Sequence, residues 1–509
     1  MSDIKEENDL LKIESDCQAY TVCENLVLGR HLVASRDIKV GEVIIREAPL
    51  LVGPRQVTGP VCLACLCKLT VTNCEPCDSC GWPLCKKESC KHSKNHFPEC
   101  EWALEKKGSK VRISQFVTPH PTYECITPLR VCYMMTKPDL WQPFAKMESH
   151  CNQRKGTFKY ESDRRSVAQF LQRFYKLDMT EEQILKACGI IQVNGHEVVN
   201  TDPPHVALYE QASLLEHSCL PTCGKTFSSK GDIIIYATAD ITKGTHLSIS
   251  YTDLLWGTIN RRHHLAESKL FLCKCPRCKD PTELGTFFSA FACRKRECPG
   301  SVLPNTFCNE SNENLLWECD HCGDVVFAKD AAMLLENIGH EIMSLGEQNI
   351  LESEKFLKKW ESFIHENHHY LVEVRLGLAL RYGDDTIEGI KKISDSELEH
   401  KIKLCKQLLA LFKKLVPGEF RVFGMLYFHL QLSINEIGRR KLESGELNDQ
   451  AIQSILLESK SFLENCIFYF QHEPENQAEG RMKEQAKHSL LEITNILKNS
   501  DSALVSSLF

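Results

Sequence analysis

Cysteine spacing constrains this chain of 509 residues more than any other feature of its sequence. Of its 27 cysteines, all but two precede residue 323, and most of those lie within residues 62–100, 273–278 and 293–322. The first eight residues contain no apolar segment of the secretory type, and no stretch approaches the roughly 20 apolar residues of a membrane span. Long chains of this kind use clustered thiolates to bind metal rather than to form disulfides. We therefore expect an intracellular protein, of the nucleus or the cytoplasm, whose clusters bind zinc.

Length and composition predict a globular protein of several units. Single domains usually run to about 100–200 residues, so this chain should contain two to four structural units. Hydrophobic residues make up 42% of the chain and charged residues 25%, which are ordinary values for globular proteins. The formal net charge of -7 argues against a nucleic-acid binder, which is normally basic. The basic stretch within residues 261–279 is a weaker argument for DNA binding, because no base-reading helix accompanies it.

Strands are predicted in two parts of the chain. Residues 20–53 contain short apolar runs at 26–28 and 43–45, with glycines between them, which is typical of hairpins. Further short apolar runs at 190–193 and 233–236 predict that strands resume there.

Helices are predicted elsewhere. Residues 101–187 have apolar side chains at helical spacing. Beyond residue 322 the pattern becomes that of long amphipathic helices, for example over 408–415, 452–470 and 490–497. Antiparallel helix pairs, with the character of a superhelix, would bury these apolar stripes.

Residues 62–100 contain enough soft ligands for two tetrahedral zinc ions. The segment has little apolar periodicity, so metal rather than a hydrophobic core must hold it together. We predict interleaved structural sites. The first ion is assigned to Cys62, Cys65, Cys85 and Cys90, and the second to Cys77, Cys80, His96 and Cys100. Cys67, Cys74 and His92 compete as ligands.

The other two clusters each predict one more zinc ion. Cys273, Cys275 and Cys278 supply three ligands where zinc needs four. Cys219 is the candidate for the fourth ligand, and Cys223 is the alternative. A zinc ribbon is predicted from the third cluster, with the ligands Cys293, Cys298, Cys319 and Cys322. Buried free cysteines are the alternative for that cluster.

Several motifs stand in a fixed order around these clusters. They are GRHLVASRDI at 29–38, Asn194, EHSCLPT at 216–222, LSISY at 247–251 and FLCKCPRC at 271–278. Together with the cysteine-rich segment they resemble the SET and MYND domain family of protein-lysine methyltransferases. The resemblance covers roughly residues 20–500. The sequence at 82–85 and the added cluster at 293–322 are similar to the arthropod branch of that family.

The resemblance implies an α+β fold in which a β-rich SET domain is split by a MYND zinc finger. A cysteine-rich post-SET segment, a zinc-ribbon-like segment and an all-α, TPR-like C-terminal domain should follow. The expected divisions are the N-terminal SET part at 20–55, the MYND finger at 62–100, a helical insertion at 101–187, the SET core at 188–255, the post-SET segment at 256–280, the ribbon-like segment at 285–330 and the helical domain at 331–509.

The resemblance also implies methyl transfer from S-adenosylmethionine to a lysine amine in a narrow channel. Displacement at a sulfonium methyl needs alignment and an uncharged amine, and an apolar channel lowers the pKa of that amine. Tyr251 matches the catalytic tyrosine of the family. The expected cofactor contacts are the backbone at Arg30 and Leu32, together with Asn194, Glu216, His217 and Phe271, of which Phe271 would pack on the adenine. Read without the family, Tyr251 and His217 are ordinary core residues and Asn194 a turn residue.

Five positions depart from the family pattern. His31 stands where the family has glycine, Glu216 and Thr222 stand for asparagines, Lys269 for a channel-lining tyrosine, and His246 for a glutamate. A cation at position 269 would repel a lysine substrate. We hypothesise that Glu216 and Lys269 pair with each other beside the channel. The alternative is that both side chains face solvent.

The leading prediction is therefore a protein-lysine methyltransferase acting on histone or other protein substrates in chromatin or transcriptional regulation. The alternative is a SET scaffold of weak or absent activity that recruits transcriptional co-regulators through the MYND finger and the helical domain. A monomer is expected, without membrane contact or direct nucleic-acid binding.

Overall fold

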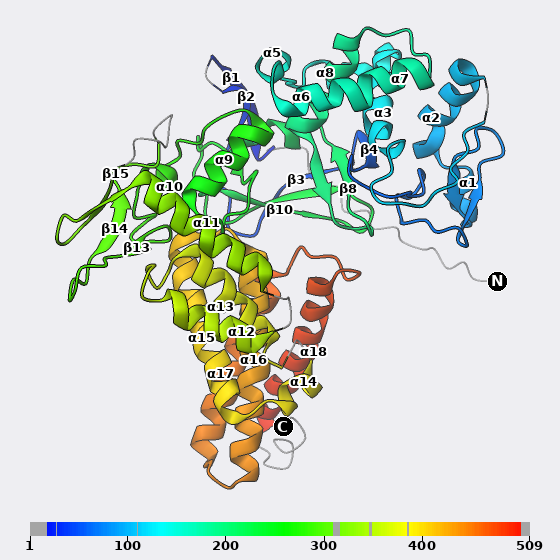
Figure 1. Ribbon diagram of the computed structural model, residues 1–509. Helices are drawn as coiled ribbons and strands as arrows, with labels where there is room; N and C mark the ends of the chain where they lie inside the picture. Colours follow the sequence, from blue (N-terminus) through cyan, green and yellow to red (C-terminus); the bar gives the residue numbers. More distant parts are fainter. Residues whose placement is uncertain are drawn as a thin grey trace, which may run out of the picture.

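The computed structural model describes residues 18–26, 28–108, 110–308, 316–345, 349–383 and 386–499. Figure 1 shows a β-rich upper part flanked by helices, and a column of helices beneath it that the C-terminal third of the chain forms. The predicted α+β fold class is confirmed. Within the described ranges no helix has the length and apolar character needed to cross a membrane.

The β-rich part consists of several small sheets that join distant segments of the chain. The first sheet is the hairpin of β1 (Tyr20–Asn25) and β2 (Gly29–Ala34). The second has the order β10 (Cys223–Phe227), β11 (Ile233–Ala237), β3 (Val43–Glu47), and the third the order β4 (Leu51–Pro54), β8 (His205–Leu208), β7 (His196–Val198). A short parallel pair, β9 (Glu216–His217) and β12 (Ser248–Ile249), completes them. Strands from before residue 62 thus pair with strands from after residue 195.

The segment between these strands is the cysteine-rich finger (residues 62–100) and a helical layer. The finger contains β5 (Cys74–Pro76), β6 (Pro83–Cys85), α1 (Glu88–Lys91), η1 (Lys94–His96) and α2 (Phe97–Trp102). The helical layer contains η2 (Ala103–Lys107), η3 (Tyr123–Cys125), α3 (Ile126–Met135), α4 (Pro138–Ala145), α5 (Cys151–Arg154), α6 (Phe158–Asp163), η4 (Arg164–Ala168), α7 (Gln169–Phe174) and α8 (Glu181–Asn194). Finger and layer share one core, in which the buried Trp82 donates a hydrogen bond to the hydroxyl of Tyr175 at 3.0 Å.

Two of the short predicted strands are wrong. Residues 190–193 form the end of helix α8, which begins with a capping box between Thr180 and Gln183. A run of four apolar residues does not distinguish a strand from a buried helix, and here the cap and the helical spacing before the run decide. Leu26 and Leu28 lie in the turn between β1 and β2 and are exposed, while Val27 is outside the described residues.

Three further helical segments accompany the sheets, namely η5 (Ala212–Leu214), α9 (Thr258–Lys269) and α10 (Pro276–Lys279). A four-stranded antiparallel sheet follows, formed in sequence order by β13 (Phe291–Ala292), β14 (Ser301–Pro304), β15 (Leu316–Cys319) and β16 (Val325–Phe327). The helical column contains α11 (Ala328–Ser344), α12 (Ile350–Trp360), α13 (His369–Arg381), α14 (Ile387–Lys392), α15 (Asp395–Leu415), α16 (Phe420–Glu443), α17 (Asp449–Tyr469) and α18 (Ala478–Asn499). The long amphipathic helices expected beyond residue 322 are confirmed.

The helical column packs against the sheet of β10, β11 and β3. The ring of Tyr236 on β11 packs against the tilted rings of Phe420 of α16 and His472, with centroid distances of 5.3 and 4.7 Å. His472 also lies 2.8 Å from the carbonyl oxygen of Gly41, which precedes β3. This contact fixes the column beside the sheet, so the two parts can share a cleft.

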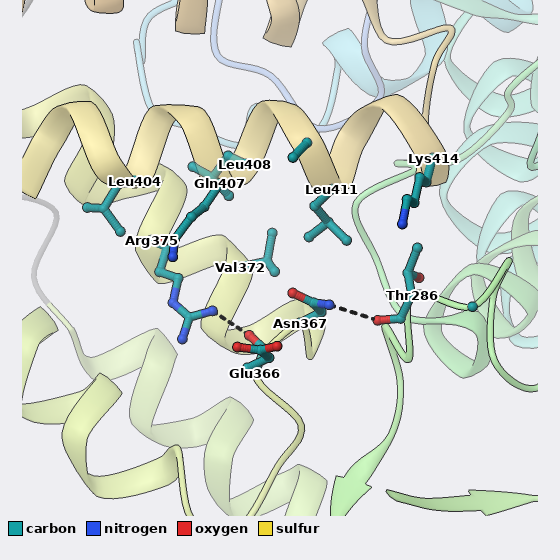
Figure 2. Close-up of a pocket in the computed structure, with 12 residues that line it drawn as sticks. Thr286, Glu366, Asn367, Val372, Arg375, Leu404, Gln407, Leu408, Leu411 and Lys414 are labelled. Carbon is teal, nitrogen blue, oxygen red and sulfur yellow. Dashed lines mark hydrogen bonds between the residues drawn. The ribbon is translucent and has the colours of Figure 1, made fainter.

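A separate hollow of about 330 Å³ lies between α13, α15 and the loop at Thr286 (Figure 2). Two of its lining residues are joined by a hydrogen bond, in which the side-chain amide of Asn367 donates to the carbonyl oxygen of Thr286 at 3.2 Å. Its lining residues take no part in the site described below.

Candidate functional site

The structure brings together the ligand atoms of all four predicted zinc sets. Within each set these atoms lie no more than 4.8 Å from one another. The finger holds Cys62, Cys65, Cys85 and Cys90 in one set and Cys77, Cys80, His96 and Cys100 in the other. The further sets are Cys219 with Cys273, Cys275 and Cys278, and Cys293 with Cys298, Cys319 and Cys322. Cys67, Cys74, His92 and Cys223 belong to none of these sets among the described residues.

One finger site has a supporting ion pair that the sequence reasoning missed. Nε2 of His96 lies 3.2 Å from Sγ of Cys80, and its Nδ1 lies 3.0 Å from a carboxylate oxygen of Glu99. Glu99 also accepts two hydrogen bonds from Arg130 of α3, and both residues are buried. Burial opposes ionisation of Glu99, but the charges and hydrogen bonds of Arg130 and His96 together outweigh it and lower the pKa of this carboxyl. A metal-binding histidine commonly donates its second N–H to such a carboxylate, and the i, i+3 spacing on one helical turn is the signal that could have revealed it.

The set around Cys219 clamps two distant segments together. Sγ of Cys219 lies 3.9 Å from Sγ of Cys273 and 3.5 Å from Sγ of Cys278. Contacts with Cys273, Cys275 and Cys278 hold the pKa of the Cys219 thiol far below its usual value. A thiolate is the form that binds metal, so Cys219 is suited to be a ligand.

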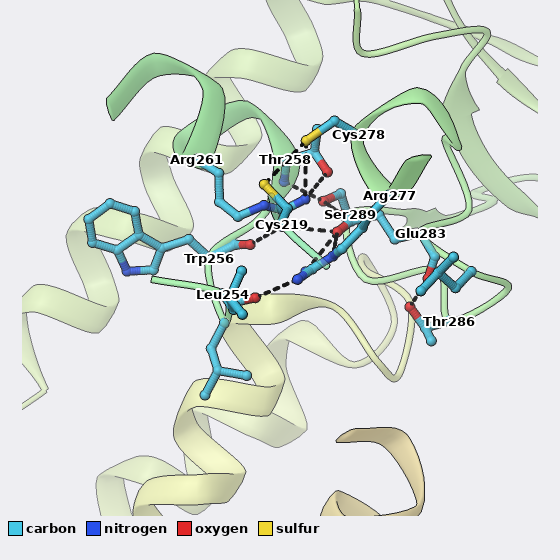
Figure 3. Close-up of polar contacts among 12 residues, drawn as sticks. Cys219, Leu254, Trp256, Thr258, Arg261, Arg277, Cys278, Glu283, Thr286 and Ser289 are labelled. Atoms are coloured by element: carbon cyan, nitrogen blue, oxygen red, sulfur yellow. Dashed lines mark hydrogen bonds and ion pairs between the residues drawn. The ribbon is translucent and has the colours of Figure 1, made fainter. Parts of the chain in front are cut away.

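A buried charge network lies directly beneath that set (Figure 3). Glu283 accepts hydrogen bonds from Arg261 at 3.0 Å and Arg277 at 2.9 Å, and all three side chains are fully buried. Ser289 donates to the other carboxylate oxygen of Glu283 at 2.5 Å. A guanidinium nitrogen of Arg261 also lies 3.8 Å from Sγ of Cys278. The network thus connects the segment of Cys278 to helix α9.

His217 connects the same set to Tyr251. Its Nδ1 accepts a hydrogen bond from the backbone N–H of Tyr251 at 3.0 Å. The proton of a neutral ring must then be on Nε2, which lies 3.3 Å from Sγ of Cys219. The imidazole is therefore fixed in one tautomer between a candidate metal ligand and the backbone of Tyr251.

Most of the predicted cofactor residues line one pocket of about 700 Å³, here called the cofactor pocket. Its lining includes Arg30, Asn194, Glu216, His217, Tyr251, Lys269 and Phe271. Leu32 does not line it, because its side chain is fully buried in the core and its carbonyl oxygen accepts the N–H of Leu247 at 2.9 Å.

The groups in this pocket fit S-adenosylmethionine. The ring of Phe271 is 37% exposed and lies 5.7 Å from the ring of His217, so an adenine can pack on it. The side-chain amide of Asn194 donates to the carbonyl oxygens of Glu148 and Ile190, both at 2.8 Å. Only its Oδ1 remains as an acceptor for a ligand amine.

A second opening of about 780 Å³, here called the interdomain cleft, lies between the sheets and the helical column. Its lining comes from β10, the segment after β12 and the segments that flank α16 and α18. Among the described residues, Tyr251 alone lines both the cofactor pocket and the interdomain cleft. Burial raises the pKa of its hydroxyl, which donates to the carbonyl oxygen of Leu215. The side chain of Tyr251 is thus protonated and separates the two cavities.

The hypothesis that Glu216 pairs with Lys269 is wrong, and so is the alternative that both face solvent. Nζ of Lys269 donates to the carbonyl oxygens of Gln192 and Val193, at 3.0 and 2.7 Å, and lies 5.5 Å above the ring of Tyr251. Burial, aided by the charge of Lys225, lowers the pKa of Lys269 to about 8. Glu216 faces His246 instead. Alternate residues of a strand point to opposite sides, and β9 directs Glu216 away from the side on which His217 meets Tyr251.

The sheets interrupted by a finger, with a tyrosine between two cavities, define a SET-domain protein, and residues 29–252 match the sequence model of the SET domain. Two isoforms of the Drosophila melanogaster SET domain-containing protein SmydA-8 are similar to this chain, with 26% and 28% identity. Each alignment covers 79% of this chain, and the two cover 85% and 88% of the isoforms' own lengths. N-lysine methyltransferase SMYD2-A of Xenopus laevis is 34% identical over 18% of this chain and 23% of its own. The chain thus contains a SET domain and is similar to SET and MYND domain-containing proteins over most of its length.

One solved structure, the SET domain of LSMT bound to lysine and AdoHcy, is 12% identical to this chain. The match covers 94% of this chain and 89% of that chain, with a TM-score of 0.25.

Proposed function

We propose that the protein is an S-adenosylmethionine-dependent protein-lysine methyltransferase with Tyr251 as its catalytic residue. The observation that carries the proposal is the position of Tyr251, which separates the cofactor pocket from the interdomain cleft. Methyl transfer requires a donor and an acceptor that approach one point from separate sides in line. A bound cofactor would supply the methyl group from the side of Phe271, and a lysine would enter from the cleft.

The chain itself would orient the amine and keep water away. The hydroxyl of Tyr251 donates to the Leu215 carbonyl, which leaves its oxygen lone pairs free to accept a hydrogen bond from an entering amine. Burial beside the rings of Tyr251, His217 and Phe271 would favour the neutral form of the amine at the reacting end, which is the nucleophile. His217 acts as a positioning residue, because it holds the backbone of Tyr251 rather than the substrate.

The charge of the interdomain cleft favours a cationic substrate. Five of its lining residues are acidic: Glu197, Asp253, Glu419, Glu473 and Glu479. Lys225 and Arg421 are the lysine and arginine in the same lining. The excess of carboxylates attracts a lysine that lies among other basic residues, so we propose basic protein segments, of histones or of other proteins, as the substrate class.

Calorimetric titration of the zinc-loaded protein with S-adenosylhomocysteine tests the cofactor pocket. We expect binding by the native chain and by Tyr251→Phe, and at least tenfold weaker binding by Phe271→Ala, which removes the adenine platform. Methyl transfer to basic lysine peptides should be lost in Tyr251→Phe. A native chain that binds no cofactor would contradict the proposal.

A second candidate function is recruitment of protein partners by a SET scaffold with little activity. The position of Lys269 favours it, because an ammonium held above Tyr251 opposes both a sulfonium cofactor and a lysine. The finger and the helical column would then bind transcriptional co-regulators. If Lys269→Tyr gains cofactor binding that the native chain lacks, this second function is supported over the first.

A further inference from the structure

Three of the positions that depart from the family pattern lie together in the structure. They are His31 on β2, Glu216 on β9 and His246, which precedes β12. Each offers one ligand atom, and these atoms lie within 4.8 Å of one another. No pattern in the sequence connects the three, since more than 180 residues separate the first from the second.

The backbone fixes this meeting point. An isolated bridge joins Val33 to His246, and Ser248 is the partner of Glu216 in the parallel pair of β12 and β9. The N–H of Glu216 also donates to the carbonyl oxygen of Leu247 at 3.2 Å. The three side chains therefore come from paired segments in fixed register rather than from mobile loops.

Their contacts resemble those of a metal site without its ion. Nδ1 of His246 lies 3.1 and 3.2 Å from the two carboxylate oxygens of Glu216. The rings of His31 and His246 stack with centroids 4.8 Å apart and an interplanar angle of 17°. Nδ1 of His31 lies 3.0 Å from the carbonyl oxygen of Gly29. A carbonyl only accepts, so the proton of a neutral His31 is on Nδ1 and its Nε2 carries the lone pair. A second N–H directed at a backbone carbonyl is how proteins orient a metal-binding imidazole.

We propose that His31, Glu216 and His246 form a further binding site for a divalent transition-metal ion, in addition to the four cysteine-containing sets. Two imidazoles and a carboxylate suit Zn²⁺, Co²⁺ or Ni²⁺ better than Mg²⁺ or Ca²⁺. Ligand atoms around a tetrahedral ion of this size lie roughly 3.3 Å apart. The pair of Glu216 and His246 already has that separation, and His31 needs to approach by a small shift.

The site is placed to exchange its ion with solvent. His31 is buried with 3% exposure, whereas the side chain of His246 is 48% exposed and that of Glu216 is 18% exposed. Three protein ligands leave a coordination position open to water on the exposed side. The cysteine sets have four ligands each, so this site should bind its ion more weakly and release it first.

Titration of the full-length chain with Co²⁺ tests the proposal. The protein carries no histidine tag and is loaded with zinc, so that the cysteine sets are already filled. We expect one additional equivalent of Co²⁺, with an absorption spectrum that lacks the intense sulfur-to-metal charge-transfer band of thiolate ligands. Binding should be at least about tenfold weaker in His246→Gln and in Glu216→Gln.

The matched control is His263→Gln, which alters an exposed histidine that faces Glu267 at 3.6 Å on helix α9. It should bind Co²⁺ as the native chain does. His31→Gln tests the buried ligand, and a thermal melt checks that this variant is folded. The proposal is overturned if the native chain takes up no extra ion below millimolar Co²⁺. It is also overturned if His246→Gln or a folded His31→Gln binds as tightly as His263→Gln, which would leave the three side chains as a hydrogen-bonded group only.

Discussion

The backbone N–H of Tyr251 donates a hydrogen bond to Nδ1 of His217, 3.0 Å away. The other nitrogen of the same ring lies 3.3 Å from Sγ of Cys219, a member of the set that also contains Cys273, Cys275 and Cys278. One imidazole therefore connects a candidate zinc site to the candidate catalytic tyrosine. Loss of the ion or of the imidazole should displace Tyr251 without removing any group that touches the substrate.

His217→Leu should lower kcat for peptide methylation by roughly 10- to 100-fold, because it removes the acceptor that positions Tyr251. The zinc content, measured by elemental analysis, should stay at the native value. His263→Gln, which changes an exposed histidine on α9, should leave kcat unaltered. Native kcat in His217→Leu would mean that Tyr251 is held by its other contacts.

Cys275→Ser should remove one equivalent of zinc and weaken S-adenosylhomocysteine binding at least about tenfold. The expected reason is that Phe271, which lines the cofactor pocket, precedes this ligand set by only two residues. Cys322→Ser removes a ligand from the set in the β13–β16 sheet and provides the matched comparison. Cys322→Ser should also lose one equivalent of zinc, but its affinity for S-adenosylhomocysteine should stay within a factor of about two of the native value. If the two substitutions weakened S-adenosylhomocysteine binding equally, the special role of the Cys275 set in cofactor binding would be refuted.

Glu283→Gln should destabilise the protein strongly. The change leaves the buried cations Arg261 and Arg277 without a counter-charge, which typically costs about 3–5 kcal/mol. We expect an early unfolding step in thermal melts at neutral pH, accompanied by zinc release detected with a chromogenic chelator. Glu267→Gln on the exposed face of α9 is the control and should melt as the native protein does. A native melt for Glu283→Gln would show that the network contributes little.

Glu419 gives the interdomain cleft a pH dependence. Burial raises the pKa of this carboxyl to about 6, from an ordinary value of 4.5, and the charge of Asp253 adds to the effect. The native state then binds more protons than the unfolded state between these values, so its stability falls as pH rises from about 4.5 through about 6. Glu419→Gln removes that penalty, and at pH 7.5 it should be more stable than the native chain by up to about 2 kcal/mol.

The gain from Glu419→Gln should vanish near pH 4.5, where the native carboxyl is already protonated. Binding of a basic peptide should change in the opposite sense, becoming tighter in the native chain as pH rises through about 6 and staying flat in Glu419→Gln. Fluorescence anisotropy with a labelled peptide measures this. If the native chain bound the peptide with the same affinity at every pH, Glu419 would have no role in substrate recognition.

Lys269 should make cofactor binding depend on pH in a way that separates substrate from product. Its pKa is lowered to about 8 by burial, so its charge is lost as pH rises from about 7 to 9. Affinity for the sulfonium S-adenosylmethionine should rise severalfold over that range, while affinity for the uncharged thioether S-adenosylhomocysteine should change little. Lys269→Tyr should remove the difference. Parallel pH profiles for the two ligands would show that the ammonium does not face the sulfonium.

The ligand groups of the metal sites could be predicted from spacing, because tetrahedral coordination requires four ligands at one point. Cys273, Cys275 and Cys278 left one position open, and Cys219 occupies that place in the structure. The cofactor pocket was predictable only through the resemblance to a family, since no local pattern brings Arg30 to Asn194 and Phe271.

Contacts across the fold were the part that the sequence could not predict. Glu216 and Lys269 have opposite charges and flank one pocket, yet β9 turns Glu216 toward His246, and the backbone carbonyls of Gln192 and Val193 satisfy Lys269. Which partner a charged side chain finds depends on strand register and on the end of helix α8. Both are set by long-range packing rather than by neighbours in the chain.

Tyr251 stands between two cavities whose other lining residues differ. In the proposed reaction, spent donor would leave and fresh donor would enter while a peptide remains bound in the cleft. A single encounter with the substrate is compatible with several rounds of turnover on the same nitrogen. The number of methyl groups added would then depend on how long the peptide stays and how much room surrounds the tyrosine hydroxyl, rather than on how often the substrate returns.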